Sequence, residues 1–521
     1  MVKLVSFFTA TCFVCLLSSS SFHLFDYLDH QFTATNYSEN AFSFAVKIHH
    51  PTALTIEQSK TNIGSDKWLL LNQKLAKNNS KAALRLVSWY QQQLIVSNTQ
   101  QTNDLIIMWL KHAIRLNSMQ AIILLSKLYY TQENYQLAQQ VLSEMSNGVE
   151  GAEIQYLQLD MLQLKVKIAV ALGEIAQVKQ LLSNVPPDYL NNKSFTNLLK
   201  DIRDYQVIKP VTVEYLKNTK LGNVFRGDLN TCLISIQLFA TTFAHLLHID
   251  KLLNKFYQQK PLSRYSCFPK PRYINVNMLD CHAKVNQAIT CDETIFENIA
   301  ASIDSRHIGL MMKQGGANVH LGILYFDKHD NVDVLSHEIS HLLGFVDEYP
   351  LSPKHQVCQE IQRKPFAHNI AVIPTFYEGD RQTIRTEVLS RVAWGSLIAK
   401  TTPVLHRVTS NLDIPFDINT MPITWQLGTP KSYQHELGVF PAETCEKAFV
   451  AESLSINNTV AFAAYKPLKK HTHLQYFNYN FPTHYENILA LDPKAYIMPS
   501  FHYNIALAKK QRSDNKRHAE H

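Results

Sequence analysis

The chain has 521 residues, of which 46% are hydrophobic and 18% charged, as is ordinary for folded globular proteins and enough for two or three domains. The formal charge of +7 is modest, and much of the excess lies in the C-terminal run 509–517. Zinc-finger spacings and basic residues interleaved with aromatic ones are both absent from the sequence, which argues against a nucleic-acid partner. We predict that residues 509–521 form a basic, disordered tail in solvent.

The N-terminus has features of an export signal. Lys3 precedes an apolar stretch from Leu4 to Leu17, and four serines follow it. Because this stretch is too short for a typical membrane span, residues 1–21 are predicted to be a secretory signal peptide of a periplasmic or secreted protein. The sequence shows no clear small-x-small cleavage site, so an uncleaved membrane anchor stays open as the alternative.

Two regions follow this leader. Residues 22–64 are polar and mixed, and they are predicted to be either a short ordered prelude or a linker. From 65 to 205 apolar residues recur at helical spacing, for example in 105–114 and 121–130. This region is therefore predicted to be an all-α domain.

One segment of the all-α region resembles a tetratricopeptide repeat. Residues 128–142 match the turn and second helix of such a unit, with Ala138 where paired helices approach closely and Tyr135 at an inter-repeat packing position. A weaker echo occurs at 171–182. The resemblance implies a TPR-like α-solenoid that binds a protein partner on its concave surface. The alternative is a helical packing domain without that role.

Residues 210–508 mix helix and strand signals, and we predict an α+β domain there. Within it, residues 319–326 have the composition of a β-strand, and a turn at 329–331 follows. The chain then enters a helical pattern that contains the most informative motif of the sequence.

His337, Glu338 and His341 form an H-E-x-x-H motif in that helix. Histidines four residues apart lie on one face of a helix, so their imidazoles can converge on a single Zn²⁺ ion. The glutamate beside them is placed to take a proton from a water molecule that the metal has acidified. The motif therefore predicts a zinc hydrolase site with Glu338 as the general base.

The residues after the motif supply a third ligand. Gly344 can adopt the left-handed conformation that ends a helix, and the chain can then return Asp347 to the metal. The whole pattern, H-E-x-x-H-x-x-G-x-x-D, resembles the metzincin signature, and its Asp-Glu-Tyr ending is similar to bacterial IgA-peptidase-like metallopeptidases. The resemblance implies a zincin-like metallopeptidase that cleaves a protein or peptide substrate, with His337, His341 and Asp347 as ligands.

Three alternatives stay open at this point. Glu360, nineteen residues after His341, lies near the spacing of a thermolysin-like third ligand. The metzincin resemblance also implies a methionine turn under the zinc, for which Met498 is preferred to Met421. Finally, the helical region alone would carry the function if the chain is a binding or scaffold protein with a non-catalytic metal site.

Cysteine usage agrees with export. Apart from two cysteines in the leader, the chain has six, all in its C-terminal half: Cys232, Cys267, Cys281, Cys291, Cys358 and Cys445. An even number in an exported protein predicts up to three disulfides, with fifteen pairings that the sequence leaves open. Free buried thiols are the alternative.

Overall fold

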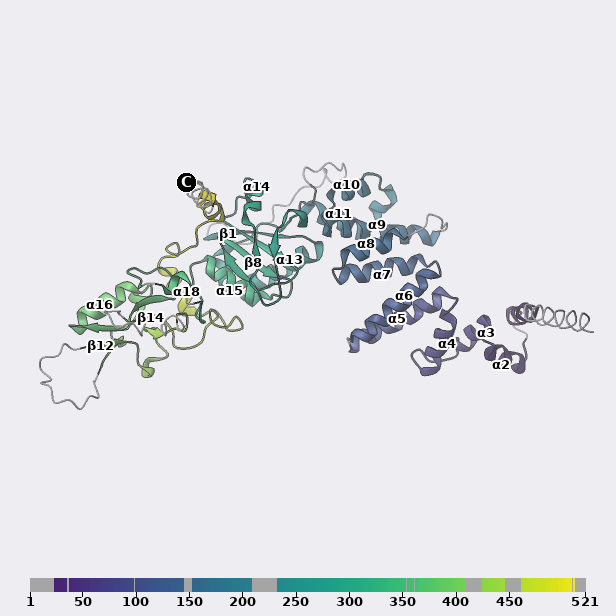
Figure 1. Cartoon of the computed structure of the whole chain (residues 1–521), viewed down its shortest axis with the longest axis horizontal. Coiled ribbons are helices and arrows are strands. Elements are labelled where there is room, and N and C mark those ends of the chain that lie inside the picture. The colour runs from purple at the N-terminus through teal and green to yellow at the C-terminus, as the bar shows by residue number, and fades with distance from the viewer. Residues whose placement is uncertain are drawn as a thin grey trace, which may run out of the picture. The chain divides into compact units, whose positions relative to one another are not determined.

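The computed structural model describes residues 23–34, 37–97, 99–144, 152–208, 232–352, 354–359, 361–408, 424–445, 461–507 and 509–510. The chain divides into two compact units, Met1–Ile168 and Ala169–His521. The first is helical, and the second combines sheets with helices (Figure 1). The predicted leader, and the predicted tail beyond residue 510, lie outside the described residues. Within the described ranges, no helix is long and apolar enough to cross a bilayer.

The helices of the first unit pack in chain order, each against the next (Figure 1). Several begin at a serine or threonine whose side chain accepts a hydrogen bond from the first-turn backbone, as at Ser65 and Thr99. Their bounds are α2 Glu39–Lys47, α3 Pro51–Ser59, α4 Asp66–Ala76, α5 Ser80–Ser97, α6 Gln100–Arg115, α7 Met119–Thr131 and α8 Tyr135–Ser143. The prediction of an all-α N-terminal region is confirmed.

The residues before this region are also helical. A helix at 23–33 precedes α2 and α3, and the three share a small core around Leu28, Phe32 and Ala45. The described part of 22–64 is thus helical and shares a core, as the ordered-prelude alternative expects. The apolar residues that form this core are few and widely spaced, which hides the helical period from the sequence.

The helix pair α7–α8 is the segment that resembles a tetratricopeptide repeat. Ala138 is fully buried, and the Ser126 hydroxyl donates to the Ala138 carbonyl oxygen at 2.7 Å. Glu133 in the intervening turn has φ 59°, which lets the chain reverse. The predicted turn and second helix at 128–142 are confirmed.

The division between the units lies upstream of the predicted one at 205–210. The hydroxyl of Tyr273 donates to the Val170 carbonyl oxygen at 2.8 Å. The backbone N–H of Tyr273 donates to the Tyr205 carbonyl oxygen at 2.8 Å. These bonds tie the end of α9 and the residue after α11 to the sheet of the second unit. The helices concerned are α9 Ala152–Ala171, α10 Ile175–Ser183 and α11 Lys193–Asp204.

A mainly parallel sheet forms the centre of the second unit. Its strands run in the order β2-β1-β6-β8-β7, β3 also pairs with β1, and only β7 is antiparallel to its neighbour. Every residue of β8 is buried, so both faces of that strand are covered. The bounds are β1 Ile234–Ala240, β2 Ser266–Cys267, β3 Arg272–Tyr273, β6 His307–Met312, β7 Asn318–His320 and β8 Ile323–Asp327.

The prediction of one strand at 319–326 is wrong, because this segment is a hairpin. Leu321 and Gly322 have φ 51° and 77°, and they form a two-residue turn between β7 and β8. Two consecutive positive φ angles are typical of such turns, but the leucine at the first position hides the usual turn signal. As a result, β7 becomes the edge strand of the sheet.

Helices and smaller sheets complete the second unit. Helices α13 Phe243–Gln259 and α15 Val332–Leu342 pack against each other and against the main sheet. Two three-stranded antiparallel sheets follow, in the orders β10-β12-β11 and β13-β14-β9. The remaining bounds are β4 Cys281–His282, β5 Thr290–Cys291, α14 Glu297–Ala300, β9 Ala371–Pro374, β10 Phe376–Glu378, α16 Arg381–Arg391, β11 Leu405–Arg407, β12 Thr424–Leu427, β13 Phe440–Pro441, β14 Phe462–Lys466 and α18 Thr483–Leu491.

All six cysteines of this unit form disulfides. The pairs are Cys232–Cys267, Cys281–Cys291 and Cys358–Cys445. The first two join neighbouring strands or their ends, and the third lies in a buried cluster with Ile370 and Val372. The prediction of three disulfides is confirmed, and the alternative of free thiols is wrong.

Candidate metal centre

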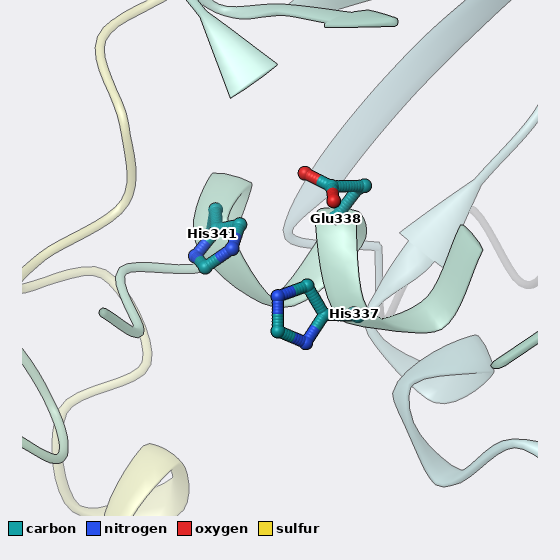
Figure 2. Close-up of side chains that lie close together, drawn as sticks. All are labelled: His337, Glu338 and His341. Atoms are coloured by element: carbon teal, nitrogen blue, oxygen red, sulfur yellow. The ribbon is translucent and has the colours of Figure 1, made fainter. Parts of the chain in front are cut away.

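Helix α15 carries the H-E-x-x-H motif. It begins where the Asn331 side chain accepts hydrogen bonds from the N–H groups of Asp333 and Val334, at 2.8 and 3.2 Å. Figure 2 shows that His337, Glu338 and His341 project from neighbouring turns of this helix. Their candidate ligand atoms lie within 4.8 Å of one another. The spacing of the motif thus brings these three side chains together as the sequence predicts.

Both imidazoles are oriented by backbone carbonyl groups. The Nδ1 of His337 is 2.9 Å from the His473 oxygen, and the Nδ1 of His341 is 3.0 Å from the Phe345 oxygen. Since a carbonyl oxygen only accepts, each Nδ1 must carry the proton. In the neutral imidazoles the lone pair is therefore on Nε2, the atom left to bind a metal.

Asp347 lies against both of these Nε2 atoms. Its Oδ1 is 3.0 Å from the Nε2 of His337 and 3.2 Å from the Nε2 of His341. A single Asp347 oxygen is therefore within hydrogen-bond distance of both rings. The structure thus brings His337, His341 and Asp347 together.

This donor set fits a divalent metal ion such as Zn²⁺. Two Nε2 lone pairs and a carboxylate oxygen repel one another unless a proton or a cation lies among them. Two imidazoles and one carboxylate are a usual protein ligand set for catalytic zinc, which leaves one position for water. Burial alone would lower the pKa of His341, but the Asp347 carboxylate outweighs it and raises that pKa to about 10.

Gly344 allows the chain to turn back after the helix, as predicted. Its φ is +93°, and the N–H of Phe345 closes the turn on the Ser340 oxygen at 3.0 Å. A Cβ at position 344 would lie only 2.3 Å from the Tyr496 carbonyl oxygen. The position therefore requires glycine both for its backbone conformation and for this close approach.

The segment that packs against Gly344 contains the preferred methionine. The N–H of Met498 donates to the Leu342 carbonyl oxygen at 3.0 Å, which places residues 496–498 beside the end of the metal-site helix. Met498 lines the same cavity as His341. The other candidate, Met421, lies outside the described residues, as does the alternative ligand Glu360.

Glu348, the neighbour of Asp347, belongs to a separate buried network. It has no exposed surface and accepts hydrogen bonds from Lys466 at 2.9 Å, Thr472 at 2.9 Å and Asn369 at 3.1 Å, and also from Tyr485. None of these four partners is an imidazole of the metal site. Glu348 thus anchors the loop that presents Asp347.

The sequence did not identify the segment 471–475 as part of the site. The His473 carbonyl oxygen accepts a hydrogen bond from the Nδ1 of His337. The Leu474 carbonyl oxygen accepts one from the backbone N–H of Glu348 at 3.0 Å. This segment therefore orients both the His337 imidazole and the loop that carries Asp347. Its residues are more than 120 positions from the motif, and no spacing rule connects them.

A search of protein-family models, curated proteins and solved structures finds no match to this chain. The resemblance to metzincins therefore rests on the motif from His337 to Asp347 and on what the surrounding geometry allows.

Glu338 has the environment of a proton acceptor. It is 5% exposed, and among the described residues its Oε2 has no hydrogen-bond partner. Burial raises its pKa, and the neighbouring imidazoles of His341 and His337 oppose that shift. A carboxylate with a raised pKa and a free oxygen beside the metal ligands can accept a proton near neutral pH.

Two cavities meet at the site. One, of about 840 Å³, reaches His337 and the turn between β8 and α15. The other, of about 410 Å³, is lined by β7, His341 and Met498. Glu338 and Tyr349 line both cavities, so they lie where the two spaces join.

Proposed function

We propose that this protein is a zinc-dependent metallopeptidase of the metzincin type. The observation that carries this proposal is the convergence of His337, His341 and Asp347, with both imidazoles held by backbone carbonyls so that Nε2 faces the carboxylate. The arrangement has three protein ligands rather than the four of a structural zinc site, which favours catalysis over a purely structural role.

Each side chain of the site has a separate role in the proposed reaction. Bound zinc would lower the pKa of a water molecule and polarise the scissile carbonyl. Glu338 accepts the proton from the attacking water and passes it to the leaving amine nitrogen. Burial, and next the Asp347 carboxylate, raise the pKa of Tyr349, so its hydroxyl stays protonated and can donate to the carbonyl oxygen of the substrate.

Two features support an extended polypeptide as the substrate. The two cavities that Glu338 lines provide room for residues before and after the scissile bond. The edge strand β7 supplies Asn318 and Val319 to the smaller cavity, and an edge strand can bind an extended peptide by adding it to the sheet. We therefore propose cleavage within a chain rather than only at its ends.

The finer architecture belongs to the same proposal. A mainly parallel sheet with one antiparallel edge strand beside the metal-site helix supports a zincin-like catalytic domain. The ordered packing of α2 to α8 supports a TPR-like α-solenoid that holds a protein partner. The three disulfides support export, with the N-terminal leader either removed or kept as an anchor.

The test combines metal analysis with peptide cleavage. The full chain should bind one zinc per molecule and hydrolyse a mixture of quenched fluorescent peptides. Glu338→Gln should keep the zinc while turnover falls on the order of 10²-fold or more, because the proton acceptor is lost. Asp333→Asn is a matched control at the start of the same helix, and it should retain activity.

His341→Ala should lose the metal together with activity. Near-normal hydrolysis by Glu338→Gln would contradict the mechanism. Stoichiometric zinc without any cleavage would instead favour a binding or scaffold protein.

A further inference from the structure

The first unit has a cavity of its own, lined by residues of α3, α4, α5 and the start of α7. It has a volume of about 400 Å³ and is lined by Trp68 of α4 and by one face of α5. Lys81, Arg85 and Trp89 follow one another at intervals of four residues, so their side chains are neighbours on that face. The cavity thus combines two cations with two indole rings.

Within the part of the chain that the structure describes, the guanidinium of Arg85 has no anionic partner. Its Nε donates at 3.0 Å to the neutral side chain of Asn72, which is itself fixed by a 2.9 Å bond to the Trp68 oxygen. Among the described residues, no carboxylate pairs with Arg85 or Lys81. The acid in the nearby helix α3, Glu57, pairs with Lys67 at 2.5 Å instead.

Partial burial destabilises the charged form of Arg85 unless an anion binds to it. Burial lowers the pKa of Arg85, and no neighbouring carboxylate opposes that shift. A partly desolvated guanidinium with unused N–H donors gains most from an anion that accepts two hydrogen bonds. Asn72 holds the guanidinium in place before any ligand binds, which reduces the entropy cost of binding.

We propose that this cavity binds a carboxylate of a polypeptide, with the carboxylate on Arg85 and Lys81 and an adjacent apolar side chain against Trp68 and Trp89. The two indoles lie side by side with ring centroids 6.5 Å apart. Ile63 at the rim is 76% exposed and extends the apolar surface. The site is distinct from the metal centre and lies wholly within the first unit.

The composition of the wall favours a peptide over other anions. Glutamine side chains from three elements, at 58, 92 and 120, offer amide donors and acceptors that suit peptide groups. Of the described residues, two cations line the cavity, whereas a phosphate-rich polymer or an anionic membrane is bound by many. The carboxylate can come from a chain terminus or from an acidic side chain, because both present the same group.

The test measures binding of short peptides by calorimetry, with the full chain carrying Glu338→Gln so that hydrolysis does not interfere. One pair is acetyl-Gly-Leu-Leu with a free carboxyl end and the same peptide amidated. The second pair is acetyl-Leu-Glu-Leu and acetyl-Leu-Gln-Leu, both with an amidated C-terminus. In at least one pair, the acid should bind about tenfold or more tightly than its neutral partner, and the pair that responds identifies the source of the carboxylate.

Arg85→Gln should remove this preference, and Arg85→Lys should keep part of it. Lys111→Gln, a loss of the same charge on an exposed position of α6, should change affinity less than about twofold. Circular dichroism checks that each variant is folded. Equal binding of acid and neutral peptides, or an unchanged preference in folded Arg85→Gln, would overturn the proposal. Binding of phosphatidylglycerol vesicles that depends on Arg85, without peptide binding, would also overturn it.

Discussion

Glu348 and Lys466 form a 2.9 Å ion pair in which the carboxylate is fully buried and the lysine side chain is 6% exposed. Glu348 follows Asp347 directly in the chain, but its hydrogen bonds go to Lys466 and other buried groups and not to the imidazoles. Because Thr472 and Tyr485 also bond to Glu348, the position of the Asp347 loop depends on this network.

Glu348→Gln should lower the free energy of unfolding by about 3–5 kcal/mol, because Lys466 is left as an uncompensated buried charge. Zinc affinity should fall roughly 10–100-fold, as expected when a group that positions a ligand is lost. Denaturant titration and a zinc competition assay measure the two effects. Replacing both partners, as Glu348→Leu with Lys466→Met, should recover stability but not affinity. Recovery of both would show that the network does not position Asp347.

Asp347→Ala should weaken zinc binding more than the roughly 10–100-fold expected for Glu348→Gln, because it removes a ligand rather than a supporting group. Asp347→His should keep some binding, since imidazole also suits zinc. Glu360→Ala is the control, and it should leave zinc binding unchanged. Loss of zinc in Glu360→Ala with retention in Asp347→Ala would favour the thermolysin-like ligand set.

Gly344→Ala should destabilise the second unit. The added methyl group meets the Tyr496 oxygen, and alanine is strained at φ +93°. Strain and overpacking together should cost about 2–4 kcal/mol. The matched control is Gly379→Ala, which also has a positive φ but no atom within 4 Å of the new Cβ. Thermal unfolding compares the two, and equal losses would show that contact with Tyr496 does not matter.

Local patterns predicted the core of the site well. The spacing of His337 and His341 fixes their relation within one helix, and Gly344 marks where that helix ends. Both signals depend on a few neighbouring residues, so the sequence alone predicts that Asp347 returns to the imidazoles. The exclusion of Glu348 as a ligand needed the structure, because two adjacent carboxylates have nearly the same reach.

Long-range contacts were less predictable. His473 orients His337 through a backbone oxygen, an interaction that leaves no requirement on the side chain at 473 and hence no sequence signal. The hairpin at Leu321 was missed because a leucine occupies a left-handed position that usually favours glycine or asparagine. The compact units divide at residue 168 and not at the end of the helical pattern, because bonds from Tyr273 attach helical residues to the sheet, and helical periodicity cannot show to which core a helix belongs.

The Cys358–Cys445 disulfide should stabilise the fold and also hold the loop that carries Asp347 in place. Thr444, next to Cys445, donates from its hydroxyl to the Asp347 carbonyl oxygen at 2.8 Å. Replacing both cysteines by serine should cost about 2–5 kcal/mol and weaken zinc binding. The same change at Cys281 and Cys291, a pair ten residues apart, is the control and should spare zinc binding. A thiol titration of the protein without its first 21 residues should find no free thiol.

Metal binding should release a proton. In the metal-free protein the Asp347 carboxylate outweighs burial and holds the pKa of His341 at about 10, so this imidazole carries an extra proton at pH 7. That proton must leave before Nε2 can bind zinc, so affinity should rise about tenfold per pH unit between pH 7 and 9. The raised pKa also stabilises the metal-free fold, fully below the ordinary histidine pKa of about 6.5, and this contribution is lost as the pH rises through about 10. Calorimetry of zinc binding at pH 7, in two buffers with different ionisation enthalpies, counts the protons. A count near one is expected, and a count near zero with unchanged affinity across this pH range would show that the ligands are not the pair formed by His341 and Asp347.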